Sequence, residues 1–153
     1  MKWIFCSILC WTILILVIDR KRFKKLFFSG LLAMTAQVLF DGLAIRQELY
    51  QIVDPVISIF GSSLFFSVGV VLPMGILVAQ FTTRSRKYQV LNIIAWTFLF
   101  TLFEYLSVYF NMMKHIHWSM QLSIVFNTMI MVVLTWFAEH FLFPKKTERG
   151  NSS

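Results

Sequence analysis

The stretch FTLFEYLSVYF, residues 100–110, combines ten residues that suit a lipid membrane with one carboxylate, Glu104. It lies in a longer run, residues 88–113, whose only charge before its end is that of Glu104. A helix that crosses the hydrocarbon core of a bilayer needs about 20 mostly apolar residues. An unanswered acid at the centre of such a helix costs on the order of 3 kcal/mol. Glu104 is therefore expected either to have partners on neighbouring helices or to carry a proton.

The composition of the whole chain indicates an integral membrane protein. Of its 153 residues 58% are apolar and only 14% are charged, and the mean hydropathy is +0.74. A water-soluble domain carries about 25% charged residues. We predict one membrane domain over residues 1–146 and a short polar tail over residues 147–153, with no room for a separate soluble domain.

Five apolar runs qualify, or nearly qualify, as membrane spans. Lipid offers no hydrogen-bond partner to the backbone, so spans that lack the alternation of an outer-membrane strand must be helices. The expected fold class is therefore all-α, a bundle of five transmembrane helices. The runs cover residues 3–18, 26–45, 55–83, 88–113 and 116–138.

The basic residues predict the orientation of the bundle. Eleven of the fourteen Lys and Arg residues fall in the first connection, the third connection and the tail. Cytoplasmic loops carry the excess of Lys and Arg, so the N-terminus is expected outside and the C-terminus inside. The same clustering argues against a nucleic-acid partner. Five cations of the first connection either only fix this topology or also bind anionic lipid headgroups, at about 1 kcal/mol each: Arg20, Lys21, Arg22, Lys24 and Lys25.

Polar residues inside the spans are candidates for a buried polar centre. Ser107 and Asn111 follow Glu104 at i+3 and i+7, on the same face of a helix. Asn127 and Gln121, in the last span, are further candidate partners of Glu104, because a polar stripe on an apolar helix is expected to face protein.

Asp41 raises the same question in the second span. Gln37 lies one helical turn before it, on the same face, and Arg46 follows five residues later. Two interpretations remain open: an interfacial Asp that is solvated or paired with Arg46, or a second member of the polar centre.

The two carboxylates also share a sequence context. FDGLAI (residues 40–45) aligns with FEYLSV (residues 103–108) at an offset of 63 residues. We therefore predict that spans 2–3 and 4–5 form parallel hairpin repeats, related by an axis along the membrane normal.

The chain shows no motif that carries known chemistry. It has no P-loop, no Gly-x-Ser-x-Gly elbow and no glycine-rich nucleotide fingerprint. Cys6 and Cys10 lie one turn apart in the first span and are interpreted as packing residues, and His115 and His117 as interfacial residues beside Trp118. We expect no cofactor, no metal and no enzymatic activity.

Several short motifs, taken in order, resemble a family of small, uncharacterised multi-pass membrane proteins from spore-forming Firmicutes. These are DRKR after the first span, Pro73 late in the third, FEY in the fourth, HW before the fifth with Ser123 and Asn127 following, and HFLFPK at its end. The resemblance implies a multi-pass topology in a bacterial plasma membrane. It implies no chemistry, because the family has no established activity.

Together these observations predict a non-enzymatic plasma-membrane protein in which Glu104 is a structural or proton-sensing polar centre. A small transporter using Asp41 and Glu104 is the first alternative, and it requires a wet cavity that reaches both. A membrane-embedded enzyme is the second, and it requires another catalytic group within hydrogen-bond reach of Glu104. Whether the chain forms a homo-oligomer or joins a larger membrane complex stays open.

Overall fold

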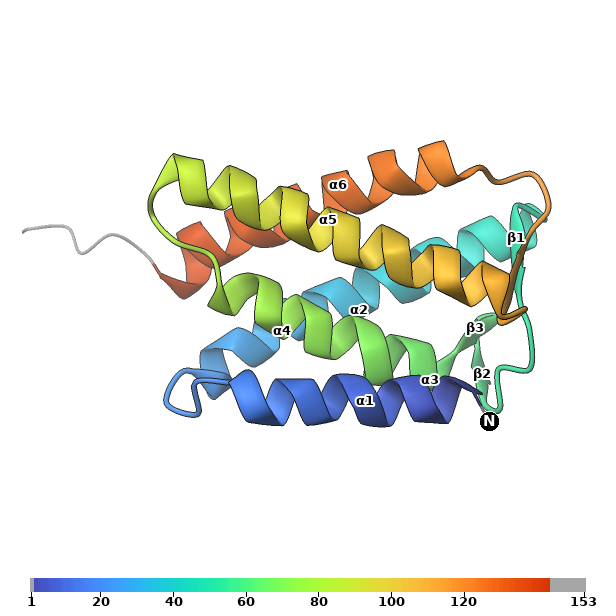
Figure 1. Ribbon diagram of the computed structural model, residues 1–153, viewed down its shortest axis with the longest axis horizontal. Coiled ribbons are helices and arrows are strands. Elements are labelled where there is room, and N and C mark those ends of the chain that lie inside the picture. The colour runs from blue at the N-terminus through green and yellow to red at the C-terminus, as the bar shows by residue number, and fades with distance from the viewer. Residues whose placement is uncertain (1, 144–153) are drawn as a thin grey trace, which may run out of the picture.

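The computed structural model describes residues 2–143, which form an antiparallel bundle of helices (Figure 1). Three of its helices are long and apolar enough to span a membrane: α2 (Phe23–Arg46), α5 (Arg86–Tyr109), and α6 (Met120–Phe137) with its continuation η2 (Ala138–Leu142). Two shorter apolar helices complete the bundle. They are α1 (Lys2–Val17) and a composite of α3 (Leu64–Phe66), the π-helical segment η1 (Ser67–Val71) and α4 (Leu72–Gln80).

The composite helix of residues 64–80 lies at the centre of the bundle. Val70, Ile76, Val78 and Ala79 are completely buried, because α1, α2 and α6 pack around it. The outer helices instead expose large apolar side chains, such as Leu16 at 79%. Soluble monomers rarely expose wide apolar surfaces, so this distribution matches a protein whose outer surface meets lipid.

The third predicted span, residues 55–83, is helical only from Leu64 onward. Its first part instead forms a β-hairpin with a two-residue loop, in which β2 (Ser58–Ile59) pairs with β3 (Ser62–Ser63). Phe60 and Gly61 at the hairpin tip both have positive φ, 51° and 87°, as a type I′ turn requires. Apolar composition suggested one continuous helix, but the turn geometry at Gly61 ends the helical pattern.

Pro73 accounts for the widened turn in the composite helix. A proline has no N–H to donate to the carbonyl four residues earlier, and such defects are commonly absorbed by a π-helical turn. η1 immediately precedes α4, and Pro73 is the second residue of α4.

The fourth and fifth predicted spans are also shortened at one end. α5 ends at Tyr109, and residues 113–115 form the strand β4 (Met113–His115). α6 begins only at Met120, where the Ser119 hydroxyl accepts a hydrogen bond from the Leu122 N–H and caps the helix. The residues between the two helices therefore close one end of the bundle.

The described basic residues gather at the opposite end. Eight of the eleven Lys and Arg residues in the described chain lie on the α1–α2 connection, on the α4–α5 connection, or in the first turn of the helix that follows. Both connections lie at the left end of the bundle in Figure 1, and the strands lie at the right end. Lys145, Lys146 and Arg149 of the tail fall outside the described residues.

α2 and α5 end in the same way. In α2, Glu48 has φ 55°, and the N–H of Leu49 bonds to the carbonyl of Ala44 at 3.0 Å. In α5, Asn111 has φ 54°, and Met112 N–H bonds to the Ser107 carbonyl at 2.8 Å. Both ends are Schellman motifs, which need one left-handed residue followed by an apolar one.

The 63-residue offset extends well beyond the short motif that suggested it. Adding 63 to the bounds of α2 gives those of α5, and the same shift converts β1 (Tyr50–Ile52) into β4. β1 and β4 pair antiparallel, with Gln51 opposite Lys114 at the centre. The two hydrogen bonds that flank this strand pair are also related by the 63-residue offset. Val53 N–H bonds to the Met112 carbonyl, and Ile116 N–H bonds to the Leu49 carbonyl, each at 2.9 Å.

Candidate functional site

Asp41 lies completely buried on α2, near the strand-capped end of the bundle. Its Oδ1 accepts hydrogen bonds from Gln37 Nε2, at 2.6 Å, and from the Tyr50 hydroxyl, while its Oδ2 accepts one from the Ser62 hydroxyl. These donors come from α2, β1 and β3, so one carboxylate joins three elements. We call Asp41, Gln37, Tyr50 and Ser62 the Asp41 cluster.

This arrangement corrects one of the two sequence interpretations of Asp41. The residue is neither solvated nor paired with Arg46, which is exposed at the last position of α2. The predicted proximity of Gln37 is confirmed by the hydrogen bond. Tyr50 and Ser62 were missed, because their approach to Asp41 depends on the β1–β4 pair and the β2–β3 hairpin, which hydropathy does not reveal.

Glu104 lies on α5 and receives three polar partners from the segment that follows. Oε1 accepts a hydrogen bond from the Ser123 hydroxyl, and Oε2 accepts one from Asn127 Nδ2 at 3.4 Å, both on α6. His115 Nε2 on β4 lies 3.2 Å from Oε1, close enough to donate when that nitrogen carries its proton. Glu104, His115, Ser123 and Asn127 form the Glu104 cluster, and the Trp118 indole N–H extends it by donating to Ser123 Oγ at 2.7 Å.

Of the four residues that the sequence offered as partners of Glu104, only Asn127 bonds to it. Ser107 donates its hydroxyl to the carbonyl of Phe103 at 2.9 Å. Asn111 is exposed, because α5 ends before the i+7 position is reached. Gln121 is exposed. It lies on a different face of α6 from Ser123 and Asn127, which are four residues apart and both buried.

His115 is the functional candidate that sequence reasoning underestimated. Its side chain is only 14% exposed, so it is not simply an interfacial residue. The strand pairing of β4 with β1 places it beside Glu104, eleven residues away in sequence. His115 belongs to the sequence KHIHW, residues 114–118, but no helical spacing connects it to Glu104. His117 is exposed, and its Nδ1 lies 3.2 Å from the Glu48 carbonyl.

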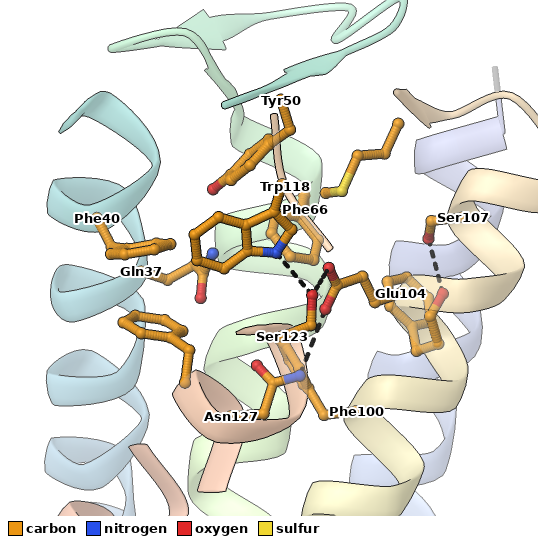
Figure 2. Close-up of a pocket in the computed structure, with 13 residues that line it drawn as sticks. Gln37, Phe40, Tyr50, Phe66, Phe100, Glu104, Ser107, Trp118, Ser123 and Asn127 are labelled. Atoms are coloured by element: carbon orange, nitrogen blue, oxygen red, sulfur yellow. Dashed lines mark hydrogen bonds between the residues drawn. The ribbon is translucent and has the colours of Figure 1, made fainter. Parts of the chain in front are cut away.

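A small cavity separates the two clusters (Figure 2). Its volume is about 30 Å³, room for roughly one water molecule. Gln37 and Tyr50 of the Asp41 cluster line one side, and Glu104, Ser123 and Asn127 line the other; Asp41 itself is not in the lining. Aromatic rings complete the wall: Phe40, Phe66, Phe100, Phe103, Trp118 and Phe126.

Tyr50 lies within electrostatic range of both carboxylates. Burial raises the pKa of its phenol far above the usual value, and the charge of Asp41, the hydrogen bond to Asp41 and the charge of Glu104 raise it further. The hydroxyl therefore keeps its proton at any physiological pH and acts as a donor to Asp41. Tyr50 donates to Asp41 and lines the cavity that Glu104 also lines.

The candidate lipid-binding cations lie at the opposite end of the bundle. All five are exposed: Arg20, Lys21, Arg22, Lys24 and Lys25. Among them only the Arg22 side chain has a described partner. Its guanidinium lies 3.7 Å from the Asp19 carboxylate and 5.3 Å from the centre of the Phe143 ring. The other four side chains extend freely from the first connection, as contact with a charged surface requires.

Neither metal chemistry nor a known relative identifies this site. Within residues 2–143, no group of three or more His, Cys, Asp or Glu residues is arranged to hold a metal ion. No protein-family model, no curated protein and no solved structure matches the chain. The function must therefore be inferred from the two carboxylate clusters and their position in the bundle.

Proposed function

We propose that this chain is a five-span protein of a bacterial plasma membrane, with its N-terminus outside, whose two buried carboxylates hold the helices together as a polar centre. The separation of the basic connections from the strand-capped end supports this orientation. α1 and the composite helix of residues 64–80 are 16 and 17 residues long. At 1.5 Å per residue they reach roughly 24–26 Å, enough to cross within a bundle whose ends are polar.

The network around Glu104 is the observation that carries the proposal. One carboxylate on α5 binds two side chains of α6 and lies beside one of β4. Hydrogen bonds to a charged group contribute about 1.5–3 kcal/mol each. Burying these donors without an acceptor would cost a similar free energy. The carboxylate therefore stabilises the arrangement of α5 and α6 in which the donors reach it.

Two substitutions at Glu104 test the structural role. Glu104→Gln keeps the shape and two polar atoms, so we expect a loss of about 1 kcal/mol of stability. Glu104→Leu removes the carboxylate and leaves Ser123 only the Ser119 carbonyl at 3.4 Å and Asn127 only Thr101 Oγ1 at 3.2 Å. We expect a loss of about 2–4 kcal/mol and lower abundance in the membrane. Unfolding of the purified protein in mixed micelles measures both.

Glu139 provides the matched control. It lies in η2 at the other end of the bundle, where its carboxylate is 3.6 Å from the exposed Arg86. Glu139→Gln and Glu139→Leu are expected to change stability by less than about 1 kcal/mol, because water screens an ion pair whose Arg86 side chain is 81% exposed. Equal effects at the two positions would contradict a polar centre at Glu104.

We further propose that residues 23–53 and 86–116 are copies of one ancestral unit, related by a pseudo-two-fold axis along the membrane normal; the offset does not extend further, because residues 58–63 form a hairpin and residues 121–126 a helix. The shared helix bounds, the paired Schellman motifs and the self-complementary register of β1 with β4 support this. Asp41 and Glu104 then occupy equivalent positions, one on each side of the axis. The resemblance to the Firmicutes membrane proteins stays a prediction.

A small transporter is the second candidate function, favoured by the cavity between the clusters. The cavity reaches Glu104 and two of the three residues that donate hydrogen bonds to Asp41, and inter-repeat cavities are where transporters bind their substrates. A transporter predicts that Glu104→Gln abolishes dye-reported proton flux into proteoliposomes while leaving abundance normal. The structural role predicts no such flux in the unsubstituted protein.

A further inference from the structure

The charges around the cavity between the clusters do not balance. Asp41 and Glu104 bring two carboxylates, and neither has a Lys or Arg among its hydrogen-bond or ion-pair partners in residues 2–143. The other titratable groups facing them are Tyr50, which is a neutral donor, and His115, which supplies at most one positive charge. Two carboxylates in an apolar interior cannot both stay ionised without compensation.

The cavity brings the two clusters within reach of a single bridging water. Water in a buried site needs two to four polar partners, and Gln37, Tyr50, Glu104 and Asn127 all line this one. Figure 2 shows Gln37 at the α2 side of the cavity and Glu104 and Asn127 at the other side, with the Trp118 ring between them in this view and the Tyr50 hydroxyl pointing toward α2. A proton on either side can then move through the water and the Tyr50 hydroxyl to the other carboxylate.

We propose that Asp41 and Glu104 form one binding site for a single exchangeable proton, shared across this cavity and supplied from the strand-capped end through His115. His115 suits the role of entry group because it contacts Glu104 directly and lies on β4, next to the exposed Lys114. Carboxylate pairs that share one proton because like charges repel are a known arrangement. The proposal rests on the polar-centre function and specifies what that centre binds.

The carbonyl stretch of a protonated carboxyl, measured by infrared spectroscopy on the purified full chain at neutral pH, tests the proposal. The expected result is one such band in the unsubstituted protein, with its shift in deuterium oxide as confirmation. Asp41→Asn should remove the band, because Glu104 then remains as a single carboxylate beside His115. Glu104→Gln should leave a band that shifts with Asp labelling alone, because the completely buried Asp41 then holds the proton by itself. Glu139→Gln should leave it unchanged.

Isotope labelling of the unsubstituted protein makes the test independent of whether the variants fold. Carbon-13 in the Asp carboxyls and, separately, in the Glu carboxyls should each shift part of the band if the two residues share the proton. In the unsubstituted protein, a band that shifts with the Asp label alone would mean a private proton on Asp41 and would overturn the proposal.

A missing band separates this proposal from the polar-centre function. No band in sodium buffer, or a band that appears only when choline replaces sodium, would overturn proton sharing, because a metal cation or His115 alone would then supply the compensation. The stability difference between Glu104→Gln and Glu104→Leu would remain as the separate test of the structural role. Loss of that difference, with the band intact, would overturn the structural role and leave the shared proton standing.

Discussion

Gly30 allows the closest approach of α2 to the central helix, so Gly30→Ala should destabilise the bundle. An added Cβ would lie 2.7 Å from the Leu72 carbonyl oxygen and 2.7 Å from Ile76 Cγ1. The oxygen belongs to a helix backbone and cannot turn aside as a flexible side chain could. Overpacking of this kind costs about 1–3 kcal/mol, and the preference of a helix for Ala over Gly returns about 1 kcal/mol.

Gly42 on the same helix is the matched control. A Cβ there would meet its nearest atom, Phe60 Cβ, at 3.4 Å, which is ordinary contact. The gain in helix propensity is common to both substitutions and cancels when they are compared. The difference between Gly30→Ala and Gly42→Ala therefore isolates the overpacking, and we expect about 1–3 kcal/mol.

Unfolding of the purified variants in mixed micelles, followed by circular dichroism as the denaturing detergent is increased, measures this difference. Gly42→Ala should unfold at or above the midpoint of the unsubstituted protein, and Gly30→Ala clearly below it. Coincident midpoints for the two variants would refute the reasoning, since they would show that α2 and α4 do not touch at Gly30 as closely as the structure has it.

Three further predictions concern the polar centre and the topology. Ser62→Ala should lower stability by about 1–3 kcal/mol, because it removes the donor to Asp41 Oδ2; an unchanged unfolding midpoint would argue against that bond. His115→Gln should slow the deuterium shift of the protonated-carboxyl band in time-resolved infrared spectra, whereas an unaltered rate would rule out entry through His115. In a cysteine-free background, an impermeant maleimide should label Lys114→Cys in intact cells and Arg84→Cys only after permeabilisation; the reverse pattern would invert the orientation.

Hydropathy sufficed to predict a helical chain with long apolar helices, because it follows from local composition. A long apolar run must hide its backbone bonds in a helix, whatever its neighbours are. The region around residues 55–63 escaped this logic. An apolar composition is shared by buried helices and strands, and the decisive feature, positive φ at Phe60 as well as Gly61, is a conformation that Phe rarely adopts.

The candidate site was predictable only as far as helical periodicity reaches. Gln37 and Asp41 are one turn apart, so their contact could be read from spacing alone. His115 and Tyr50 reach the carboxylates through the pairing of β1 with β4, whose strands are separated by more than 60 residues. No local pattern encodes that register; it is set by where α2 and α5 end.

The ends of α2 and α5 share their geometry where they do not share residue type. Glu48 and Asn111 occupy the same left-handed position, and Leu49 and Met112 the same apolar position after it, although neither pair is identical. A Schellman motif requires only those properties, so substitution can erase sequence similarity while the helix ends persist.

The donors to the two carboxylates diverge further while their chemistry persists. Asp41 receives its hydroxyl from Ser62 on a hairpin, whereas Glu104 receives one from Ser123 on a helix. A buried carboxylate requires a donor at hydrogen-bond distance. It does not require that the donor come from a particular helix or strand. Each of the two acids, although they differ in length, therefore accepts a hydrogen bond from a Ser hydroxyl in the segment that follows it.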